Sequence, residues 1–333
     1  MANSNQDLHT ARTNAADEFY TDYEDVKNEF IFNDVPVYYL KDKRVFCPCD
    51  DWKKSNFYAF LKNHFVEFGI KSLTALSYPS TNYVEYDGTH EEIRLNVLPN
   101  KSEIDNGDFS GTFSQYLMQC SDVIITNPPF SKFRQFFTQL IASGKEFLIL
   151  GNINAVTYKE VFPHIVENQV WLGHSIHSGD RKFYVPDEYP LNGTACGTDD
   201  KGRYIRVKGV RWFTNMHQVS FENMFNYKTL EKSYKIEADY YKKFDTFDAI
   251  NVNSYKEIPY DYDGYIGCPV TVIDYLNSHT NTVCFLNPNE EEIKFKVIGM
   301  LNSGGHPENF DFQKPIIENK CKFKRLIIEK VKN

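Results

Sequence analysis

The nonapeptide DVIITNPPF, residues 122–130, is the most informative stretch of the chain for its architecture. Its first five residues form a short, nearly continuous apolar run, which is typical of a strand buried on both faces. Its last four residues, Asn127-Pro128-Pro129-Phe130, end that strand abruptly, because proline donates no backbone N–H and cannot continue a central strand. The sequence therefore predicts a buried strand followed by a stiff turn.

Strands and helices alternate on both sides of this stretch. We expect strands at 44–47, 72–78, 122–126, 147–150 and from 170. We expect helices at 17–32 (beginning near Thr21 or Asp22), 55–68, 111–119, 131–143 and 154–168, and a hairpin at 82–96 around Asp87-Gly88. The alternation predicts an α/β fold with a mostly parallel sheet covered by helices on both faces. Ligands bind such sheets at the carboxyl ends of strands, where loops 47–51 and 127–130 lie.

The character of the chain changes along its length. Residues 1–16 are polar and predict a mobile N-terminal arm. Residues 17–220 carry the alternation of strands and helices and predict one large domain. After about residue 215, Tyr, Asn and Lys dominate and the helical alternation stops. Residues 221–333 are therefore predicted to form a smaller C-terminal α+β region.

The bulk properties indicate a globular protein that acts in a reducing compartment. Seven cysteines have no regular spacing, and Cys47-Pro48-Cys49 has no second pair to complete a zinc site. His174 and His177 are expected to be packed or surface histidines, so we expect no metal. We find no apolar signal core and no run of the roughly 20 apolar residues that a membrane span needs. A monomeric, cytoplasmic protein is expected.

The tetrapeptide at 127–130 suits the methylation of a delocalised amine. The lone pair of such a nitrogen is drawn into its ring or carbonyl, so two hydrogen-bond acceptors at its N–H groups would free it. The side-chain oxygen of Asn127 and the carbonyl of Pro128 are the candidate acceptors, and Pro129 stiffens their mount. Phe130 is placed to stack on a base that has been flipped out of a duplex. The alternative is a strand and turn without chemistry; the apolar strand before the motif and the helix after it favour catalysis.

At this point the sequence resembles the EcoRI-type adenine-specific DNA methyltransferases. The resemblance spans nearly the whole chain in family order. Its segments are 17–21 (DEFYT), 47–51 (CPCDD) with 55–57 (SNF), 122–130, 151–155 (GNINA) with 157–160 (TYKE), 170–173 (VWLG), 263–269 and 322–325 (KFKR).

The resemblance implies a fold, a reaction and partners. The fold would be the class I Rossmann-like methyltransferase fold, with 17–220 as the catalytic domain and 221–333 as a target-recognition region. The enzyme would transfer a methyl group from S-adenosylmethionine to N6 of a flipped-out adenine in double-stranded DNA, leaving S-adenosylhomocysteine. It would serve a restriction–modification system, or act as an orphan or phage enzyme.

The resemblance also assigns residues to the methyl donor. They are Tyr20, Thr21, Cys47, Asp50, Asp51, Phe57, Asp108, Phe109 and Asn127. Two departures from the usual pattern stand out. The loop at 47–51 has none of the glycines that normally let backbone approach the donor, and the strand at 72–78 ends in Leu76-Ser77-Tyr78 without the acid that normally binds ribose hydroxyls. The ribose contact is therefore unassigned.

The overall charge argues against nucleic acid, because the chain carries a net charge of −8. Positive charge is nevertheless clustered, as phosphate contacts require. The predicted DNA contacts are Lys132 and Arg134 beside the tetrapeptide, and Arg203, Arg206, Lys208 and Arg211 in an acid-free stretch at 201–211. A second basic stretch runs from 320 to 332, and lysines that protect strand edges are the alternative explanation there.

Two other functions remain open at this stage. The tetrapeptide serves equally well in a methyltransferase acting on adenine in RNA or on a protein glutamine, because an amide nitrogen has the same delocalised lone pair. The other possibility is a nucleic-acid-binding protein whose catalytic domain has decayed.

Overall fold

The computed structural model describes residues 19–31, 39–99, 101–191, 194–216, 227–277, 279–301 and 314–332. The predicted arm at 1–16 lies outside these residues. The chain divides into two compact units: Met1–Asn152 with Gly173–Val219, and Ile153–Leu172 with Ser220–Asn333. The second unit thus includes residues 153–172, which the sequence predicts to lie inside a continuous domain at 17–220.

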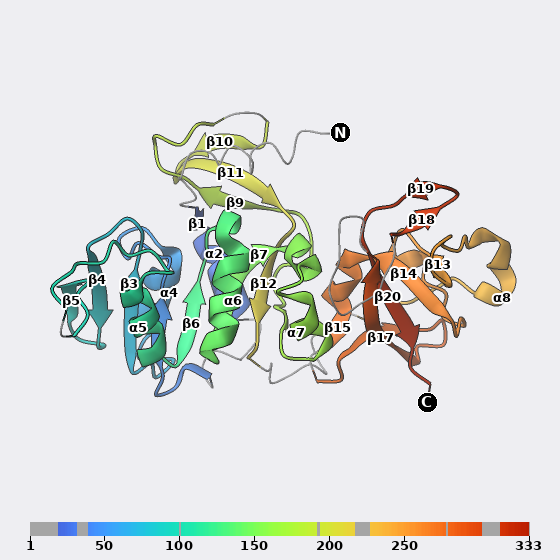
Figure 1. Ribbon diagram of the computed structural model, residues 1–333, viewed down its shortest axis with the longest axis horizontal. Helices are drawn as coiled ribbons and strands as arrows, with labels where there is room; N and C mark the ends of the chain where they lie inside the picture. The colour runs from blue at the N-terminus through green and yellow to red at the C-terminus, as the bar shows by residue number, and fades with distance from the viewer. Residues whose placement is uncertain are drawn as a thin grey trace. The chain divides into compact units, whose positions relative to one another are not determined.

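The first unit is built on a central sheet with the strand order β5-β4-β3-β2-β6-β7-β12 (Figure 1). The neighbours β3 (Ser72–Leu76), β2 (Arg44–Cys47), β6 (Val123–Thr126) and β7 (Glu146–Asn152) are parallel. The strands β4 (Asn82–Tyr86), β5 (Glu91–Leu95) and β12 (Val210–Thr214) are antiparallel to their neighbours. The α/β class is confirmed.

The expectation of a mostly parallel sheet holds only for the four central strands, because β4, β5 and β12 pair antiparallel with their neighbours. The chain turns back directly from β4 to β5 at Asp87-Gly88, as the sequence predicted, and such a tight turn can join only antiparallel strands. Gly88 has a φ of 98°, a backbone conformation that side chains rarely adopt. The last strand, β12, reverses direction beside β7.

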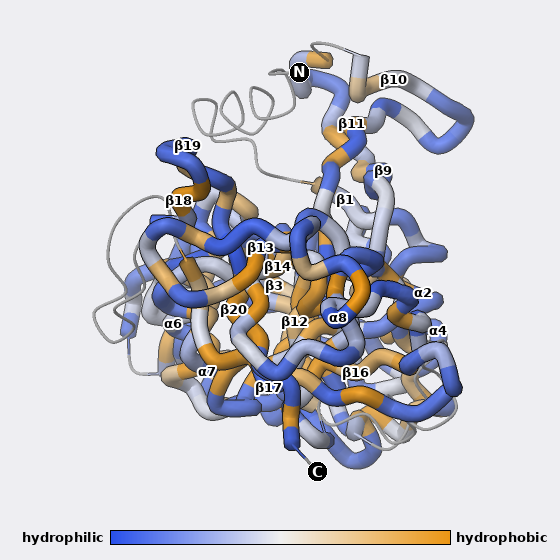
Figure 2. Tube along the Cα trace, turned by 90° about the vertical axis from the view of Figure 1, so that its right-hand side faces the viewer, coloured by the Kyte–Doolittle hydropathy of each residue, from blue (hydrophilic) through white to orange (hydrophobic). Residues whose placement is uncertain are grey.

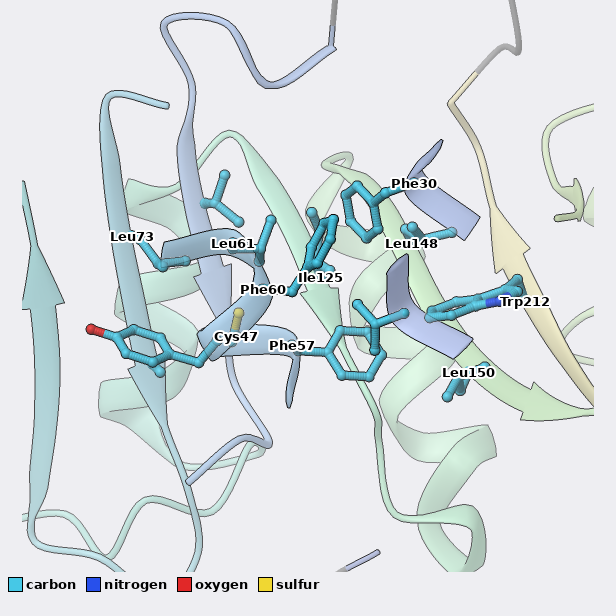
Figure 3. Close-up of a cluster of buried hydrophobic side chains, with 14 of the residues drawn as sticks. Phe30, Cys47, Phe57, Phe60, Leu61, Leu73, Ile125, Leu148, Leu150 and Trp212 are labelled. Atoms are coloured by element: carbon cyan, nitrogen blue, oxygen red, sulfur yellow. The ribbon is translucent and has the colours of Figure 1, made fainter. Parts of the chain in front are cut away.

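Helices cover both faces of the central sheet. On one face α2 (Tyr23–Ile31) and α4 (Asn56–Asn63) pack on alternate strand residues, and Figure 3 shows Phe30, Phe60 and Leu61 against Ile125 and Leu148. The other face carries α5 (Thr112–Cys120) and α6 (Phe133–Ser143), where the ring of Phe137 contacts Phe147 edge to face. Because side chains of a strand alternate between faces, a wholly buried strand such as β6 needs both layers.

A second, smaller sheet in the first unit has the order β1-β9-β11-β10, and we call it the outer sheet. Its strands are β1 (Tyr20–Thr21), β9 (Asp180–Tyr184), β11 (Gly202–Lys208) and β10 (Cys196–Asp199), all antiparallel. The helix expected to begin near Thr21 or Asp22 begins at Tyr23. Residues 20 and 21, just before the helix, pair with Tyr184 and Phe183, because β9 offers them an open strand edge.

The second unit contains a sheet with the order β13-β14-β20-β17-β16-β15. The strands are β13 (Ala249–Asn251), β14 (Tyr265–Pro269), β20 (Arg325–Lys330), β17 (Glu292–Leu301), β16 (Thr282–Leu286) and β15 (Leu276–Asn277). Figure 2 shows hydrophobic segments near the labels of β14 and β20, and the side chains of Ile266, Leu326 and Ile328 are buried. Shorter elements are α8 (Tyr234–Glu237), η3 (Ala238–Tyr240), η4 (Tyr255–Glu257), η5 (Val270–Tyr275), β18 (Ile316–Ile317) and β19 (Lys320–Cys321).

The segment 153–172 contains η2 (Ile153–Thr157), α7 (Phe162–Val166) and β8 (Trp171–Leu172) rather than the single helix expected at 154–168. Pro163 lies in the first turn of α7, where its missing N–H is harmless, whereas it would break a helix continuing from upstream. Hydrogen bonds of 2.7 Å from Lys324 Nζ to Thr157 Oγ1 and of 2.9 Å from Asn281 Nδ2 to the Val166 carbonyl tie this segment to the rest of the unit. No described helix has the length and apolar character to cross a membrane.

Candidate active site

The two loops singled out in the sequence meet at the carboxyl edge of the central sheet, because β2 and β6 are parallel neighbours. The backbone N–H of Cys49 donates to Thr126 Oγ1 at 3.2 Å. The same hydroxyl donates to Asp50 Oδ2 at 2.5 Å. Loop 47–51 and tetrapeptide 127–130 are therefore joined through the last residue of β6.

Asp50 is a buried carboxylate, 4% exposed, whose two oxygens are both engaged. Besides Thr126, it accepts from the Ser55 hydroxyl at 2.6 Å and from the backbone N–H of Asn127. Burial raises the pKa of Asp50 to about 6, although these three hydrogen bonds act in the opposite direction. The hydrogen-bonding capacity of Asp50 is therefore used by groups of the protein itself. The neighbouring Asp51 is only half-buried.

Ser55 connects Asp50 to helix α4. Its Oγ accepts from the backbone N–H groups of Phe57 and Tyr58 at 3.1 and 3.3 Å, so it caps the helix while donating to the carboxylate. The next residue, Asn56, donates from Nδ2 to the Thr21 carbonyl at 2.7 Å. Asn56 was not among the predicted site residues, and its place within the SNF triplet was the only signal for it.

Asn127 has one satisfied and one unsatisfied side-chain atom. Its Nδ2 donates to the Phe19 carbonyl at 2.7 Å. Its Oδ1 is buried and has no hydrogen-bond partner among the described residues. A carbonyl can only accept, so the contact with Phe19 determines which end of the amide faces the strand and leaves the oxygen for another donor. A buried acceptor without a partner costs about 1–3 kcal/mol, so this oxygen is available to accept a hydrogen bond from a ligand.

The two prolines and Phe130 turn the chain from β6 into helix α6. The Pro129 carbonyl accepts from the backbone N–H of Lys132 at 3.0 Å, which begins the single turn η1 (Phe130–Lys132). The half-buried ring of Phe130 contacts the rings of Phe19 and Phe183 edge to face, with centroids 6.3 and 5.8 Å away. One face of the tetrapeptide is therefore lined by aromatic side chains from the outer sheet and from the residue before it.

The predicted donor-binding residues fall into two groups. Cys47 and Phe57 lie inside the hydrophobic core, 0% and 1% exposed, and Figure 3 shows them among the buried side chains. Both side chains pack in the core beneath loop 47–51 and are closed to solvent, so they do not line a donor site. Thr21 is different: its Oγ1 is buried without a partner among the described residues, two residues from the Phe19 carbonyl. The side chain of Tyr20 is half-buried, with Lys54 Nζ 5.6 Å from its ring centroid.

The segment at 107–109 reaches the same edge of the sheet. Gly107 has a φ of 78°, and a Cβ there would collide with the Ser77 carbonyl, so only glycine lets this loop pack on the end of β3. Asp108 Oδ2 accepts from Lys132 Nζ at 3.1 Å. Burial raises the pKa of Asp108, but hydrogen bonds from Ser110 and Lys132 outweigh it and leave the pKa below its ordinary value. Phe109 is buried, and Lys132 Nζ lies 5.6 Å from its ring centroid.

The predicted DNA contacts are unequally accessible. Arg206 and Lys208 on β11 and Arg134 on α6 are exposed. Arg203 is half-buried and donates to the Tyr189 carbonyl at 2.7 Å. The prediction for Arg211 is wrong: it is 3% exposed and donates to the carbonyls of Val210 and His177. β12 is buried along its whole length, so its alternate residues have no solvent face.

Histidine, cysteine and acidic side chains of the described residues form no group of three or more that would hold a metal ion. Burial, with a smaller contribution from His177, lowers the pKa of His174 to about 4. The backbone N–H groups of His174 and Ser175 donate to the buried carboxylate of Glu29 at 3.1 and 2.8 Å. These hydrogen bonds hold the segment against helix α2.

Comparisons with known proteins place nearly the whole chain in one family. The model of the family "Adenine-specific methyltransferase EcoRI" matches residues 7–331. The chain is 37% identical to Type II methyltransferase M.EcoRI of Escherichia coli over 294 residues, 82% of this chain and 87% of the relative. It is 31% identical to Type II methyltransferase M.MpnI of Mycoplasma pneumoniae over 95% of both chains. It is 30% identical to Type II methyltransferase M.MgeORF184P of Mycoplasma genitalium over 86% of this chain and 89% of the relative. No solved structure matches the chain. The match over nearly its whole length shows that this chain belongs to the EcoRI family of adenine-specific methyltransferases.

Proposed function

We propose that the protein is a DNA adenine methyltransferase that transfers a methyl group from S-adenosylmethionine to N6 of an adenine flipped out of the duplex. The observation that carries the proposal is the buried, unpartnered Oδ1 of Asn127, whose amide is oriented by the Phe19 carbonyl. An adenine amine would supply the missing donor. The family membership and the names of the relatives support the same reaction.

The tetrapeptide activates the amine by accepting its hydrogen bonds. Asn127 Oδ1 takes one N–H of N6 and the Pro128 carbonyl takes the other, so the lone pair is released from the ring. Positive charge develops on the nitrogen as its bond to the methyl carbon forms, and both oxygens stabilise that charge. A bound sulfonium donor would supply the electrophilic methyl group and leave as a neutral thioether, and N6 would release one proton to water.

The donor site would lie where the loops after β2, β3 and β6 meet, as in a class I Rossmann-like fold. The residues present suit S-adenosylmethionine. Thr21 offers an unpartnered buried hydroxyl, Asp51 a half-buried carboxylate for the amino group, and Asp108 an acceptor for the adenine amine. Tyr78, 48% exposed at the end of β3, is the residue we assign to the ribose side. The loop without glycines is held by the side chain of Asp50 instead.

Phe130 would hold the flipped base by stacking. Its ring is half-buried against Phe19 and Phe183, so one face is supported while part of the ring is still exposed. Flipping a base costs a few kcal/mol, and an aromatic stack returns about 1–3 kcal/mol of it.

DNA phosphates would be bound by the exposed cations of the first unit: Arg134, Arg206 and Lys208, with Arg203 at the margin. Lys132 would join them only after leaving Asp108. The C-terminal region would read the target. There the hairpin of β18 and β19 exposes Lys320 beside Phe323, which is 64% exposed. By contrast Arg325 is 8% exposed and donates to Asn251 Oδ1, and Lys330 donates to the Tyr260 carbonyl.

Relatives named Type II methyltransferases support a role in restriction–modification.

Radiolabelled donor, offered separately with duplex DNA, RNA and protein, tests the substrate class. We expect label in DNA, at N6 of adenine by nucleoside digestion and mass spectrometry. Label only in RNA or in protein glutamine would select one of the other methyltransferases, and no label with any substrate would point to a decayed catalytic domain.

A further inference from the structure

Resting on the proposed function, we propose that Asp50 and Asn56 are positioning residues in a closed ring of hydrogen bonds that orients the amide of Asn127. Neither residue touches the reacting atoms. The ring runs through three segments that are distant in the sequence, at 19–21, 50–56 and 126–127, and each of its links is a contact of the first unit.

One half of the ring is organised by Asp50. Its oxygens hold the Asn127 backbone N–H, the Thr126 hydroxyl at 2.5 Å and the Ser55 hydroxyl at 2.6 Å. The carboxylate is 4% exposed, so water does not compete effectively for these donors. Asp50 therefore determines where the backbone of Asn127 lies relative to the start of α4.

The other half is organised by Asn56. The Thr21 carbonyl accepts from Asn56 Nδ2 at 2.7 Å, and the Phe19 carbonyl accepts from Asn127 Nδ2 at 2.7 Å. Carbonyls two residues apart in an extended segment point to the same side, so the two asparagines clamp one edge of β1. The ring closes through the peptide bond between Ser55 and Asn56.

The ring determines the chemistry because an amide has two different ends. With the Phe19 carbonyl in place, Asn127 presents oxygen to the substrate. If β1 moves away, the amide is free to turn and present its NH₂ group, which cannot accept from an adenine amine. A displacement of about 1 Å in a reacting geometry costs up to about 100-fold in rate. The expected signature is therefore a loss of kcat.

Asn56 allows the sharper test, because it is half-buried and its substitution leaves Asp50 intact. We expect Asn56→Ala to lower kcat about 10-fold to 100-fold at saturating donor and duplex DNA, in folded enzyme well below its Tm. Asn56→Asp is isosteric but places an acceptor against the Thr21 carbonyl, so kcat should fall further. Asn63→Ala, an exposed asparagine at the end of the same helix, is the matched control and should retain wild-type kcat.

A double-mutant cycle tests whether the ring acts as one unit. If it does, Asp50→Asn with Asn56→Ala should lose little more kcat than the worse single variant. Additive losses would show two independent supports and overturn the ring. If Asp50→Asn does not fold, the Asn56 variants decide alone: wild-type kcat with a lowered Tm would assign Asn56 a structural role only. Failure of the wild-type enzyme to methylate DNA would instead overturn the proposed function.

Discussion

The loops after β2 and β6 end neighbouring parallel strands, yet they use their polar side chains in opposite ways. In the first, both oxygens of Asp50 are occupied by protein donors. In the second, Asn127 keeps one buried acceptor without a partner among the described residues. Buried polar groups that are satisfied stabilise a structure, whereas an unsatisfied one is tolerated where a ligand completes it. Under the proposed function, this difference separates the residue that supports the site from the residue that activates the amine.

The largest effect is expected from removing the open acceptor. Asn127→Ala should lower kcat about 100-fold to 1,000-fold, the usual cost of deleting one group that stabilises developing charge. Donor binding, measured by calorimetry, should largely survive, because the amide faces the amine. Near-normal turnover by this variant would contradict the acceptor role.

Besides positioning Asn127, the satisfied carboxylate of Asp50 should make the stability of the fold depend on pH. The pKa of Asp50 is raised to about 6 in the folded protein, against about 3.9 in an unfolded chain. Between these values the folded state binds more protons, so the free energy of unfolding should fall as pH rises from about 4 to about 6. The whole decrease in the free energy of unfolding is about 3 kcal/mol.

Urea unfolding across this pH range measures the effect. Asp50→Asn should remove that part of the pH dependence. Asp51→Asn, which changes the half-buried neighbour, should preserve it. Identical pH dependence of wild type and Asp50→Asn would show that Asp50 titrates normally.

A smaller effect is expected beside the acceptor, at Phe130. Phe130→Ala should weaken the Kd for duplex DNA about 5-fold to 100-fold, which corresponds to one lost stack of about 1–3 kcal/mol. Phe130→Tyr keeps a stacking ring and should retain most of the affinity in a fluorescence-anisotropy titration. Equal weakening by both variants would assign Phe130 to packing with Phe19 and Phe183 instead.

The smallest effect is expected in the basic stretch at 201–211. There, as in the two loops, one side chain is exposed for a ligand and another is bound by the protein. Arg206→Ala should reduce the slope of log affinity against log salt by about 1, one phosphate contact. Lys71→Ala, an exposed lysine at the amino-terminal edge of the sheet, should leave the slope unchanged. Arg211→Ala should lower stability by about 1–3 kcal/mol, because its buried carbonyl partners lose their donor. A wild-type slope for Arg206→Ala would remove Arg206 from the DNA surface.

Much of the fold was predictable because its signals are local. The strand at 44–47 and the hairpin at 82–96 agree with the structure, since apolar runs and turn residues act over a few positions. The division of 154–168 into two short helices is also encoded locally, by Pro163, which is harmless only in the first turn of a helix. Strand β1 was not predictable, because residues 20 and 21 are extended only where β9 offers them an edge.

The candidate site divides in the same way. The chemical types in DVIITNPPF and the family resemblance were enough to predict an amine-activating turn at a sheet edge. Contacts between residues distant in the sequence were not predictable. The packing of separate segments brings Asp50 to Thr126 and Asn56 to Thr21, and it buries Arg211. Residue type limits what a side chain is able to do, but its hydrogen-bond partners and its exposure to water exist only once distant segments meet. For this protein, the reaction is therefore a property of a short motif, and the orientation that makes it possible is a property of the fold.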